Sequence, residues 1–195
     1  MNKEADMNCV GNAQYVHGRV KEMTLTGVIT ALFCICGPLA VPLPVSPVPI
    51  SLTNLVIYLA LYILGMRRSL ISYLLYLLIG FIGVPVFSGF TGGPAKLLGP
   101  TGGYLAGFIL LVLIGGLAID RRTANRWICL AGMVLGTAVC YLFGTLWLAR
   151  QAQMPFAGAL AAGVIPFIPG DVCKMAAAML IGPEIRKRLR RAKLD

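Results

Sequence analysis

The sequence predicts an all-α integral membrane protein with six transmembrane helices, both termini in the cytoplasm, and proline- and glycine-rich loops on the outer side. Of its 195 residues, 58% are hydrophobic and only 12% are charged, and the mean hydropathy is +0.83. A soluble domain carries about 25% charged residues, so this apolar surface is expected to face lipid. The length suits six spans of about 20 residues with short connections.

The formal net charge of +10 does not indicate a nucleic-acid partner. The basic residues form short clusters between apolar runs rather than a surface interleaved with aromatic residues. None of the six cysteines has a CxxC spacing, and most lie in or beside apolar runs, so neither a zinc site nor a disulfide scaffold is expected.

Three regions follow from the pattern of polarity along the chain. Residues 1–22 are polar and lack the apolar core of a signal peptide, which predicts a cytoplasmic tail. Residues 23–185 form the membrane domain, and residues 186–195 form a basic cytoplasmic tail. The predicted spans are the apolar runs at 23–40, 51–66, 70–87, 104–119 and 127–148, and a sixth helix beginning near Pro169.

The three connections predicted on the outer side are longer than plain turns need to be. Residues 41–50 hold four prolines and are expected to be extended, residues 88–103 are rich in glycine, and residues 150–168 include a short helix or re-entrant piece at 155–165. Irregular backbone near a membrane is tolerated where protein buries it or water reaches it. These loops therefore favour a pocket that opens outward, with simple turns as the alternative.

The distribution of Lys and Arg sets the predicted orientation. Most of the 17 basic residues lie in the N-terminal tail, at Arg67-Arg68, at 121–126 and at 186–193. These segments fall on one side when the polar segments alternate across six spans, and Lys and Arg mark the cytoplasmic side. The basic C-terminal tail is expected to rest on anionic lipid headgroups.

Asp171 and Lys174 are an acid and a base within the sixth apolar segment. Three residues apart, they share one face of a helix and can pair, and Asp171 falls in the first turn, where the helix dipole favours a carboxylate. A structural ion pair is the alternative reading. Because charge inside a span is costly and usually marks a substrate or ion path, the pair is the leading candidate for a binding site.

Weaker candidates lie near the outer side. Lys96 is the one cation in the glycine-rich loop and could attract an anionic solute, or could simply be a solvated lysine. Tyr104 offers a ring and a hydroxyl, or serves as an interfacial anchor, and Asn54 opens the second span. Gly27 and Ala31 in the first span have the small-xxx-small spacing that permits close helix approach.

Motifs for catalysis or ATP hydrolysis do not occur in the sequence. There is no Walker motif, no HExxH and no GxSxG, and the single histidine, His17, lies in the polar tail. We therefore predict no catalytic residue, no metal site and no cofactor, and we expect a partner to perform any ATP-driven work. An intramembrane enzyme that uses Asp171 as an acid or base remains an alternative.

Four segments, in order along the chain, resemble the BioY family, the biotin-binding S components of energy-coupling factor transporters. They are PVPIS at 47–51, GVPVFSGFTGG at 83–93, GPTGGYLAGF at 99–108 and PFIPGDVCK at 166–174. The resemblance runs from about residue 24 to residue 182. It implies six helices, a biotin site near the outer face, and a prokaryotic cell membrane as the location. It also implies a transmembrane coupling subunit and two cytoplasmic ATPases as partners.

The resemblance also implies which residues meet the ligand. Asp171 and Lys174 are matched to the family's binding motif, and Asp171 could accept hydrogen bonds from the ureido N–H groups while Lys174 donates to the carbonyl or the carboxylate. The remaining predicted site residues lie in or beside the other motifs and are Asn54, Phe87, Ser88, Lys96, Gly102, Gly103 and Tyr104. Gly27 and Ala31 are matched to the motif that docks the coupling subunit. An S component for another vitamin is the open alternative.

Overall fold

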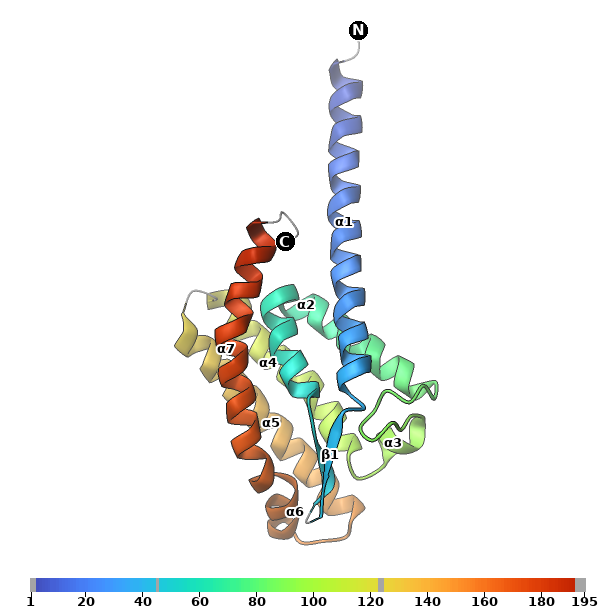
Figure 1. Cartoon of the computed structure of the whole chain (residues 1–195), viewed down its shortest axis with the longest axis vertical. Coiled ribbons are helices and arrows are strands. Elements are labelled where there is room, and N and C mark those ends of the chain that lie inside the picture. The colour runs from blue at the N-terminus through green and yellow to red at the C-terminus, as the bar shows by residue number, and fades with distance from the viewer. Residues whose placement is uncertain (1–2, 45, 123–124, 192–195) are drawn as a thin grey trace.

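The structure is a computed structural model that describes residues 3–44, 46–122 and 125–191. These residues form seven α-helices, a 3-10 turn and a β-hairpin (Figure 1). The helices are α1 Lys3–Cys36, α2 Thr53–Phe81, α3 Pro94–Leu98, α4 Gly102–Arg122, α5 Arg126–Gln151, α6 Phe156–Gly163 and α7 Ile168–Arg191. The hairpin consists of β1 Ala40–Leu43 and β2 Ser46–Ser51, and the 3-10 turn η1 is Ile165–Phe167.

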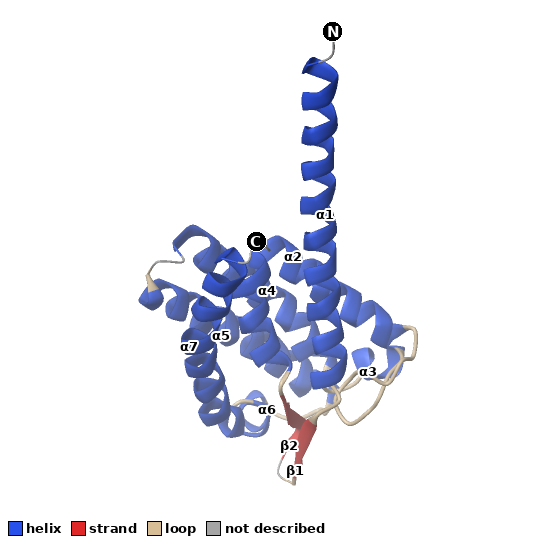
Figure 2. Cartoon of the chain, turned by 45° about the horizontal axis from the view of Figure 1, so that its top comes forward, coloured by secondary structure: helices blue, strands red, loops and turns tan. Residues whose placement is uncertain are grey.

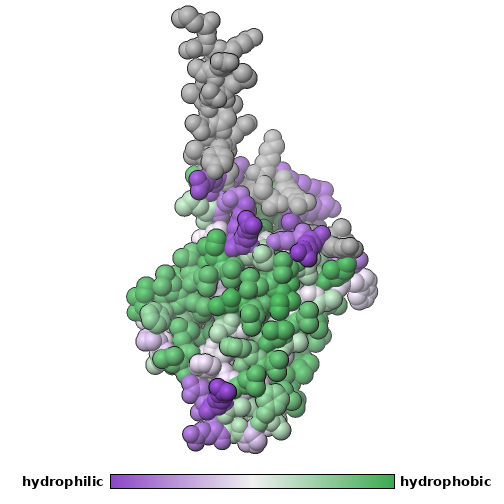
Figure 3. Space-filling model, turned by 180° about the vertical axis from the view of Figure 1, so that it is seen from behind, coloured by the Kyte–Doolittle hydropathy of each residue, from purple (hydrophilic) through white to green (hydrophobic). Residues whose placement is uncertain are grey.

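The long helices give the molecule two distinct ends. The N-terminal half of α1 and the C-terminal end of α7 lie at one end, and the hairpin and α6 lie at the other (Figures 1 and 2). On the face shown in Figure 3, apolar side chains form a broad band between two polar ends. Within the described residues, four segments are long and apolar enough to cross a membrane: Thr53–Phe81, Gly102–Arg121, Arg126–Gln151 and Phe156–Leu189.

The terminal helices extend beyond the predicted spans. Part of the segment predicted as an N-terminal tail is helical, because α1 runs unbroken from Lys3, and α7 continues to Arg191 through the predicted basic tail. Once an apolar segment has nucleated a helix, each further residue adds a hydrogen bond at little cost, so the helix propagates into polar sequence. The side chains of residues 1–18, including His17, and residues 192–195 lie outside the described part.

Helix α2 joins the predicted second and third spans through a kink. Gly65 has φ 74°, a left-handed conformation that glycine adopts without steric cost. The Met66 N–H, released from the helix at this point, donates to Asp120 Oδ2 of α4 at 2.9 Å. Arg68, just beyond the kink, forms an ion pair with Glu22 of α1. The predicted turn at Arg67-Arg68 is therefore a bend two residues earlier, capped by a side chain of another helix.

Helices α4 and α5 pack along a seam of small residues. A Cβ placed on Gly107 would lie 2.9 Å from Cys140 Sγ, one on Gly132 would lie 2.2 Å from the Ala118 side chain, and one on Gly136 would lie 3.1 Å from the Leu111 carbonyl. Glycine permits this approach because a side chain at any of these positions would force the backbones apart. The seam fixes the relative position of the two helices.

A cluster of aromatic rings links α1 and α2 to α4 and to the start of the glycine-rich loop. Phe33 of α1 lies 5.6 Å from both Tyr73 and Tyr76 of α2, and Tyr76 meets Phe87 edge to face at 5.5 Å. The Tyr73 hydroxyl donates to the Leu105 carbonyl of α4 at 2.8 Å. Buried aromatic pairs stabilise a core beyond the area they bury. This cluster anchors the start of the glycine-rich loop through Phe87.

The proline-rich segment is extended, as predicted, and it folds back on itself as a hairpin. Strands β1 and β2 are antiparallel, with Ala40 opposite Ser51 and Leu43 opposite Ser46. Proline is tolerated here because a two-stranded hairpin has only edge strands. The chain between α5 and α7 also follows the prediction, since the short helix α6 precedes a final helix that begins at Ile168.

Candidate ligand-binding site

A pocket lies where β2, α2, α4, α5 and α7 meet, at the hairpin end of the molecule. We call it the main pocket. Its empty volume is about 700 Å³, part of it open to solvent. Small-molecule sites in proteins combine apolar walls with a few placed polar groups. The main pocket has this character, because most of its lining is apolar or aromatic and its charged side chains are Asp171 and Lys174.

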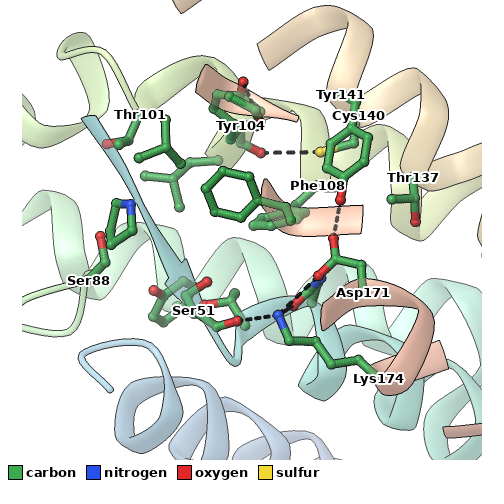
Figure 4. Close-up of a pocket in the computed structure, with 18 residues that line it drawn as sticks. Ser51, Ser88, Thr101, Tyr104, Phe108, Thr137, Cys140, Tyr141, Asp171 and Lys174 are labelled. Atoms are coloured by element: carbon green, nitrogen blue, oxygen red, sulfur yellow. Dashed lines mark hydrogen bonds and ion pairs between the residues drawn. The ribbon is translucent and has the colours of Figure 1, made fainter. Parts of the chain in front are cut away.

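The charged side chains belong to a buried network, the Asp171 cluster, made of Asn54, Tyr141, Asp171 and Lys174 (Figure 4). Asp171 Oδ1 accepts from Asn54 Nδ2 at 2.6 Å and from Lys174 Nζ at 3.0 Å. Asp171 Oδ2 accepts from the Tyr141 hydroxyl. Asp171 is only 6% exposed, so its charge depends on these partners rather than on water.

Lys174 is held as firmly as the carboxylate. Besides Asp171, its ammonium donates to the Ser51 carbonyl at 2.7 Å and to Asn54 Oδ1 at 3.0 Å. Ser51 ends β2, so the ammonium links α7 to the base of the hairpin. Charge-assisted hydrogen bonds of this kind are shorter and stronger than neutral ones.

Local sequence explains why these side chains converge. Asp171 and Lys174 are one turn apart at the start of α7, which is tethered by η1 and α6 to the end of α5. Asn54 lies in the first turn of α2, directly after the hairpin. Tyr141 comes from the middle of α5. The polar side chains therefore come from three separate helices, α2, α5 and α7, brought to the same end of the bundle.

The opposite side of the main pocket carries neutral polar groups. Figure 4 shows Ser88 and Thr101 on the side away from Asp171 and Lys174, with the rings of Tyr104 and Phe108 between them. Thr101 is 8% exposed, and its Oγ1 has no hydrogen-bond partner within the described part of the chain. A buried hydroxyl without a partner is costly, so this side offers a polar position for a ligand or a water molecule.

Tyr104 contributes its ring to the pocket rather than its hydroxyl. The hydroxyl donates to the Gly163 carbonyl at the end of α6 at 3.0 Å. Cys140 Sγ approaches the Tyr104 carbonyl at 3.7 Å, and the ring fills the space above Gly144. These contacts fix the ring as an apolar wall between the two polar sides.

A second cavity, the side pocket, adjoins the main pocket. It has an empty volume of about 520 Å³ and lies between the hairpin and the glycine-rich loop. Pro49 and Ser88 line both cavities, so they form a shared wall. Lys96 of α3 lines the side pocket, and partial burial lowers the pKa of its ammonium. The ammonium of Lys96 therefore lies on the far side of Ser88 from the main pocket.

The predicted site residues divide into three groups. Asn54, Ser88, Tyr104, Asp171 and Lys174 line the main pocket, and Lys96 lines the side pocket. Phe87, Gly102 and Gly103 line neither cavity within the described residues and have packing contacts instead. Phe87 belongs to the aromatic cluster, and a Cβ on Gly102 or Gly103 would strike the Leu97 carbonyl or Trp147.

Sequence reasoning missed Tyr141, Thr101 and Phe108. Tyr141 lies in an apolar run and has no charge to draw attention, and its role depends entirely on the packing of α5 against α7. Thr101 and Phe108 lie within the segment GPTGGYLAGF, so that motif held the signal although these positions were not singled out.

The predicted docking residues lie away from the pocket. Gly27 and Ala31 are exposed on α1. A Cβ on Gly27 would meet nothing within 4 Å, and the neighbouring Val28 is 58% exposed. This face of α1 therefore has room for another helix to approach.

Comparisons with known proteins agree with the fold and the motifs. The sequence profile of the BioY family matches residues 3–191. The chain is 36% identical over 168 residues to a probable biotin transporter BioY of Pyrococcus horikoshii, covering 86% of this chain and 98% of the relative. It is 33% identical over 168 residues to the biotin transporter BioY of Thermotoga maritima, covering 86% and 97%.

A solved structure has the same fold. It is the crystal structure at 2.1 Å of the S-component for biotin from an ECF-type ABC transporter. The TM-score is 0.81 at 32% identity, and the match covers 87% of this chain and 92% of the other. Four long apolar helices, a profile that spans nearly the whole chain and relatives matched over almost their full length lead to one conclusion: this multi-pass membrane protein belongs to the BioY family.

Proposed function

We propose that this chain is the substrate-binding membrane subunit of a biotin importer in a prokaryotic cell membrane. The observation that carries the proposal is the Asp171 cluster, a buried acid and base with two polar partners at one side of an otherwise apolar pocket. The names of the relatives and of the solved S-component support biotin as the ligand. The chain would bind its ligand without changing it chemically.

Biotin suits the division of the main pocket. Its ureido ring carries N–H groups, its sulfur ring is apolar, and its tail ends in a carboxylate. We infer that the ureido ring lies at the Asp171 cluster, the sulfur ring lies between Tyr104 and Phe108, and the carboxylate points toward Ser88 and Thr101. Lys96, beyond Ser88, would attract the negative charge from the side pocket.

The proposed topology has six membrane crossings. They are α1, the two parts of α2 on either side of Gly65, α4, α5 and α7, with α6 as a short re-entrant helix. The bend at Gly65 supports a reversal between the second and third crossings. Both termini would then lie in the cytoplasm, which agrees with the ends of α1 and α7 lying at the same end of the molecule (Figure 1).

We propose that a coupling module supplies the energy. The sequence has no ATP-binding motif, so a transmembrane coupling subunit and two cytoplasmic ATPases would reorient the loaded protein toward the cytoplasm. The exposed face of α1 at Gly27 and Ala31 would dock the coupling subunit, because small residues permit close helix approach. Basic residues at the end of α7 would contact anionic lipid.

The test of ligand identity is binding by the purified protein. We expect a ligand of biotin's mass to copurify, and biotin to outcompete a panel of other vitamins in calorimetric displacement. Preferential binding of another vitamin would favour the alternative S component. Conversion of a lipid-borne substrate to product by the purified protein would favour the intramembrane enzyme instead.

The test of the docking face uses matched substitutions to tryptophan. Gly27→Trp should prevent copurification with the coupling subunit while leaving biotin binding intact. Leu135→Trp is the control, because Leu135 is 59% exposed on α5, away from this face. Equal copurification of both variants would contradict the assignment.

A further inference from the structure

The side pocket is a second concave space that the proposed position of biotin does not occupy. Its empty volume is about 520 Å³, and it lies between the hairpin and the glycine-rich loop. Within the described residues, the linings of the side pocket and the main pocket share only Pro49 and Ser88. The two cavities therefore meet at these two residues, one on the hairpin and one on the loop.

Contacts outside the side pocket hold its walls in place. The N–H of Gly89, in the loop wall, donates to the carbonyl of Pro38 at 3.2 Å. The indole N–H of Trp147 on α5 donates to the carbonyl of Gly99 at 2.9 Å, which fixes the end of the short helix that carries Lys96. Because these walls are tied to α1 and α5, the cavity is shaped before a ligand arrives, and a ligand that enters it has little backbone to order.

The lining of the side pocket combines a neutral wall with one cation. Lys96 is partly buried and is the one charged side chain among the described residues that line the cavity. The Ser46 hydroxyl is used within the hairpin, since it accepts from the Val48 N–H at 3.0 Å and donates to the Val48 carbonyl at 3.1 Å. Most of the other lining residues are prolines. Such a cavity suits a short neutral chain that ends in an anionic group.

The proposed orientation of biotin directs its carboxyl group toward the side pocket. Ser88 lies on the side of the main pocket away from Asp171, and it lines both cavities (Figure 4). A group joined to the carboxyl carbon of the ligand would therefore extend past Ser88 toward Lys96. If the junction is an amide, its carbonyl oxygen can still accept from the Thr101 hydroxyl. The negative charge then moves from the main pocket to the far end of the appended chain.

We infer that the side pocket is a subsite for the appended part of biotin conjugates, and that the protein binds amides of biotin with an amino acid, whose terminal carboxylate pairs with Lys96. This inference rests on the proposed function and deepens it, because it adds a second class of ligand to biotin. Biotin itself fills the main pocket, and a conjugate fills both cavities.

The first test compares two conjugates that differ in charge and have the same shape. Biotinyl-β-alanine ends in a carboxylate, and biotinyl-β-alaninamide ends in a neutral amide. Calorimetry with the purified protein should give biotinyl-β-alanine an affinity within about tenfold of that of biotin. Biotinyl-β-alaninamide should bind about fivefold more weakly than biotinyl-β-alanine, the upper range for an ion pair at a partly exposed site.

Lys96→Gln closes a cycle with these two ligands. The variant keeps the length of the side chain and removes its charge, so the difference in affinity between the two conjugates should disappear. A fivefold difference that persists in Lys96→Gln would show that Lys96 does not meet the carboxylate, and this result would overturn the pairing.

The second test fills the side pocket from the hairpin. Ala40 lines the side pocket and not the main pocket. Ala40→Trp should lower the affinity of both conjugates at least about tenfold and that of biotin less than about threefold. Val41→Trp is the matched control, because successive residues on a strand point to opposite faces and Val41 is 63% exposed. All three ligands should keep their affinity in this control.

The subsite and the proposed function fail in different ways. If biotin binds the wild type and biotinyl-β-alanine does not, or if Ala40→Trp weakens biotin as much as the conjugates, the proposed function stands and the subsite is wrong. If another vitamin binds and biotin does not, the proposed function is wrong and the subsite falls with it. Biotin binding by Ala40→Trp reports that this variant is folded, and the Lys96→Gln cycle decides if it aggregates.

Discussion

The two polar sides of the binding region are built in contrasting ways. The Asp171 cluster is buried, and its charges are paired and hydrogen-bonded across β2, α2, α5 and α7. The opposite side consists of Ser88, Thr101 and, behind them, Lys96, on loop segments and the short helix α3. One side has its buried charges paired, and the other has a buried hydroxyl with no partner among the described residues.

This contrast separates recognition from access. A preorganised buried network costs nothing to order when the ligand arrives, so it discriminates strongly between chemical groups. The opposite side, built from loops with the partly buried Lys96 behind it, can attract the negatively charged group of a ligand and adjust to it. Substitutions at the Asp171 cluster should therefore change whether biotin is held, and substitutions at the other side should change how it enters.

The largest effect is expected for Asp171→Asn. The amide keeps the shape but removes the charge that balances Lys174, and it adds donors where acceptors are needed. Breaking a buried charge pair lowers the free energy of unfolding by about 3 kcal/mol or more. Because the amide also turns donors toward the N–H groups of the ligand, biotin affinity should fall about a hundredfold. Calorimetry on the detergent-purified variant measures this, and affinity within threefold of wild type would contradict the assigned role.

Tyr141→Phe should have the next largest effect. It removes the hydroxyl that donates to Asp171 Oδ2 and keeps the ring. A hydrogen bond to a charged group contributes about 1.5 kcal/mol or more to stability. Without it Asp171 is less firmly oriented toward the ligand, and we expect biotin affinity to fall about tenfold. Tyr104→Phe is the matched control, since its hydroxyl binds the Gly163 carbonyl outside the cluster. Equal losses of biotin affinity in Tyr141→Phe and Tyr104→Phe would contradict a specific role for the Tyr141 hydroxyl.

Thr101→Val examines the opposite side of the main pocket. Its hydroxyl is buried without a protein partner, so its removal should leave the thermal midpoint of the free protein unchanged or higher. If the biotin carboxylate accepts from this hydroxyl, affinity should fall about tenfold, the lower end of the range for a hydrogen bond to a charged group. A stability loss together with unchanged affinity would assign Thr101 a purely structural role.

Lys96→Gln should have the smallest effect on equilibrium binding. We expect a loss of about threefold, mainly in the association rate and mostly at low salt, because a charge at an entrance steers an anion. Burial lowers the pKa of Lys96, so its charge is lost at lower pH than for an ordinary lysine. The wild-type association rate, followed by stopped flow, should fall as pH rises through that pKa, and the variant should not show this fall.

The sequence predicted the regions where single residue types carry a strong physical constraint. Two charges in an apolar segment drew attention to Asp171 and Lys174, and prolines predicted the extended course of residues 41–50 and the start of α7. The basic clusters predicted an orientation with both termini in the cytoplasm, which stays a prediction. Each of these signals is local, so it can be detected without knowledge of the fold.

What could not be predicted depends on contacts between distant segments. Tyr141 is an ordinary aromatic residue in an apolar run until α7 brings Asp171 to it, 30 positions away. The kink at Gly65 depends on a cap from Asp120, 54 positions from Met66. Phe87, Gly102 and Gly103 lie in motifs beside the pocket, and only packing shows that their contacts are with the core.

The glycine seam between α4 and α5 has a consequence for redesigning the protein. Two helices in backbone contact cannot be spread by a bulkier ligand without losing the packing of both, so the wall that carries Tyr104, Phe108 and Tyr141 sets a fixed dimension. A variant meant to import a larger vitamin analogue would have to gain its space from the hairpin and the glycine-rich loop. Library positions for such a selection are therefore best placed at Val48, Pro49 and Ser88, and the seam is best left unchanged.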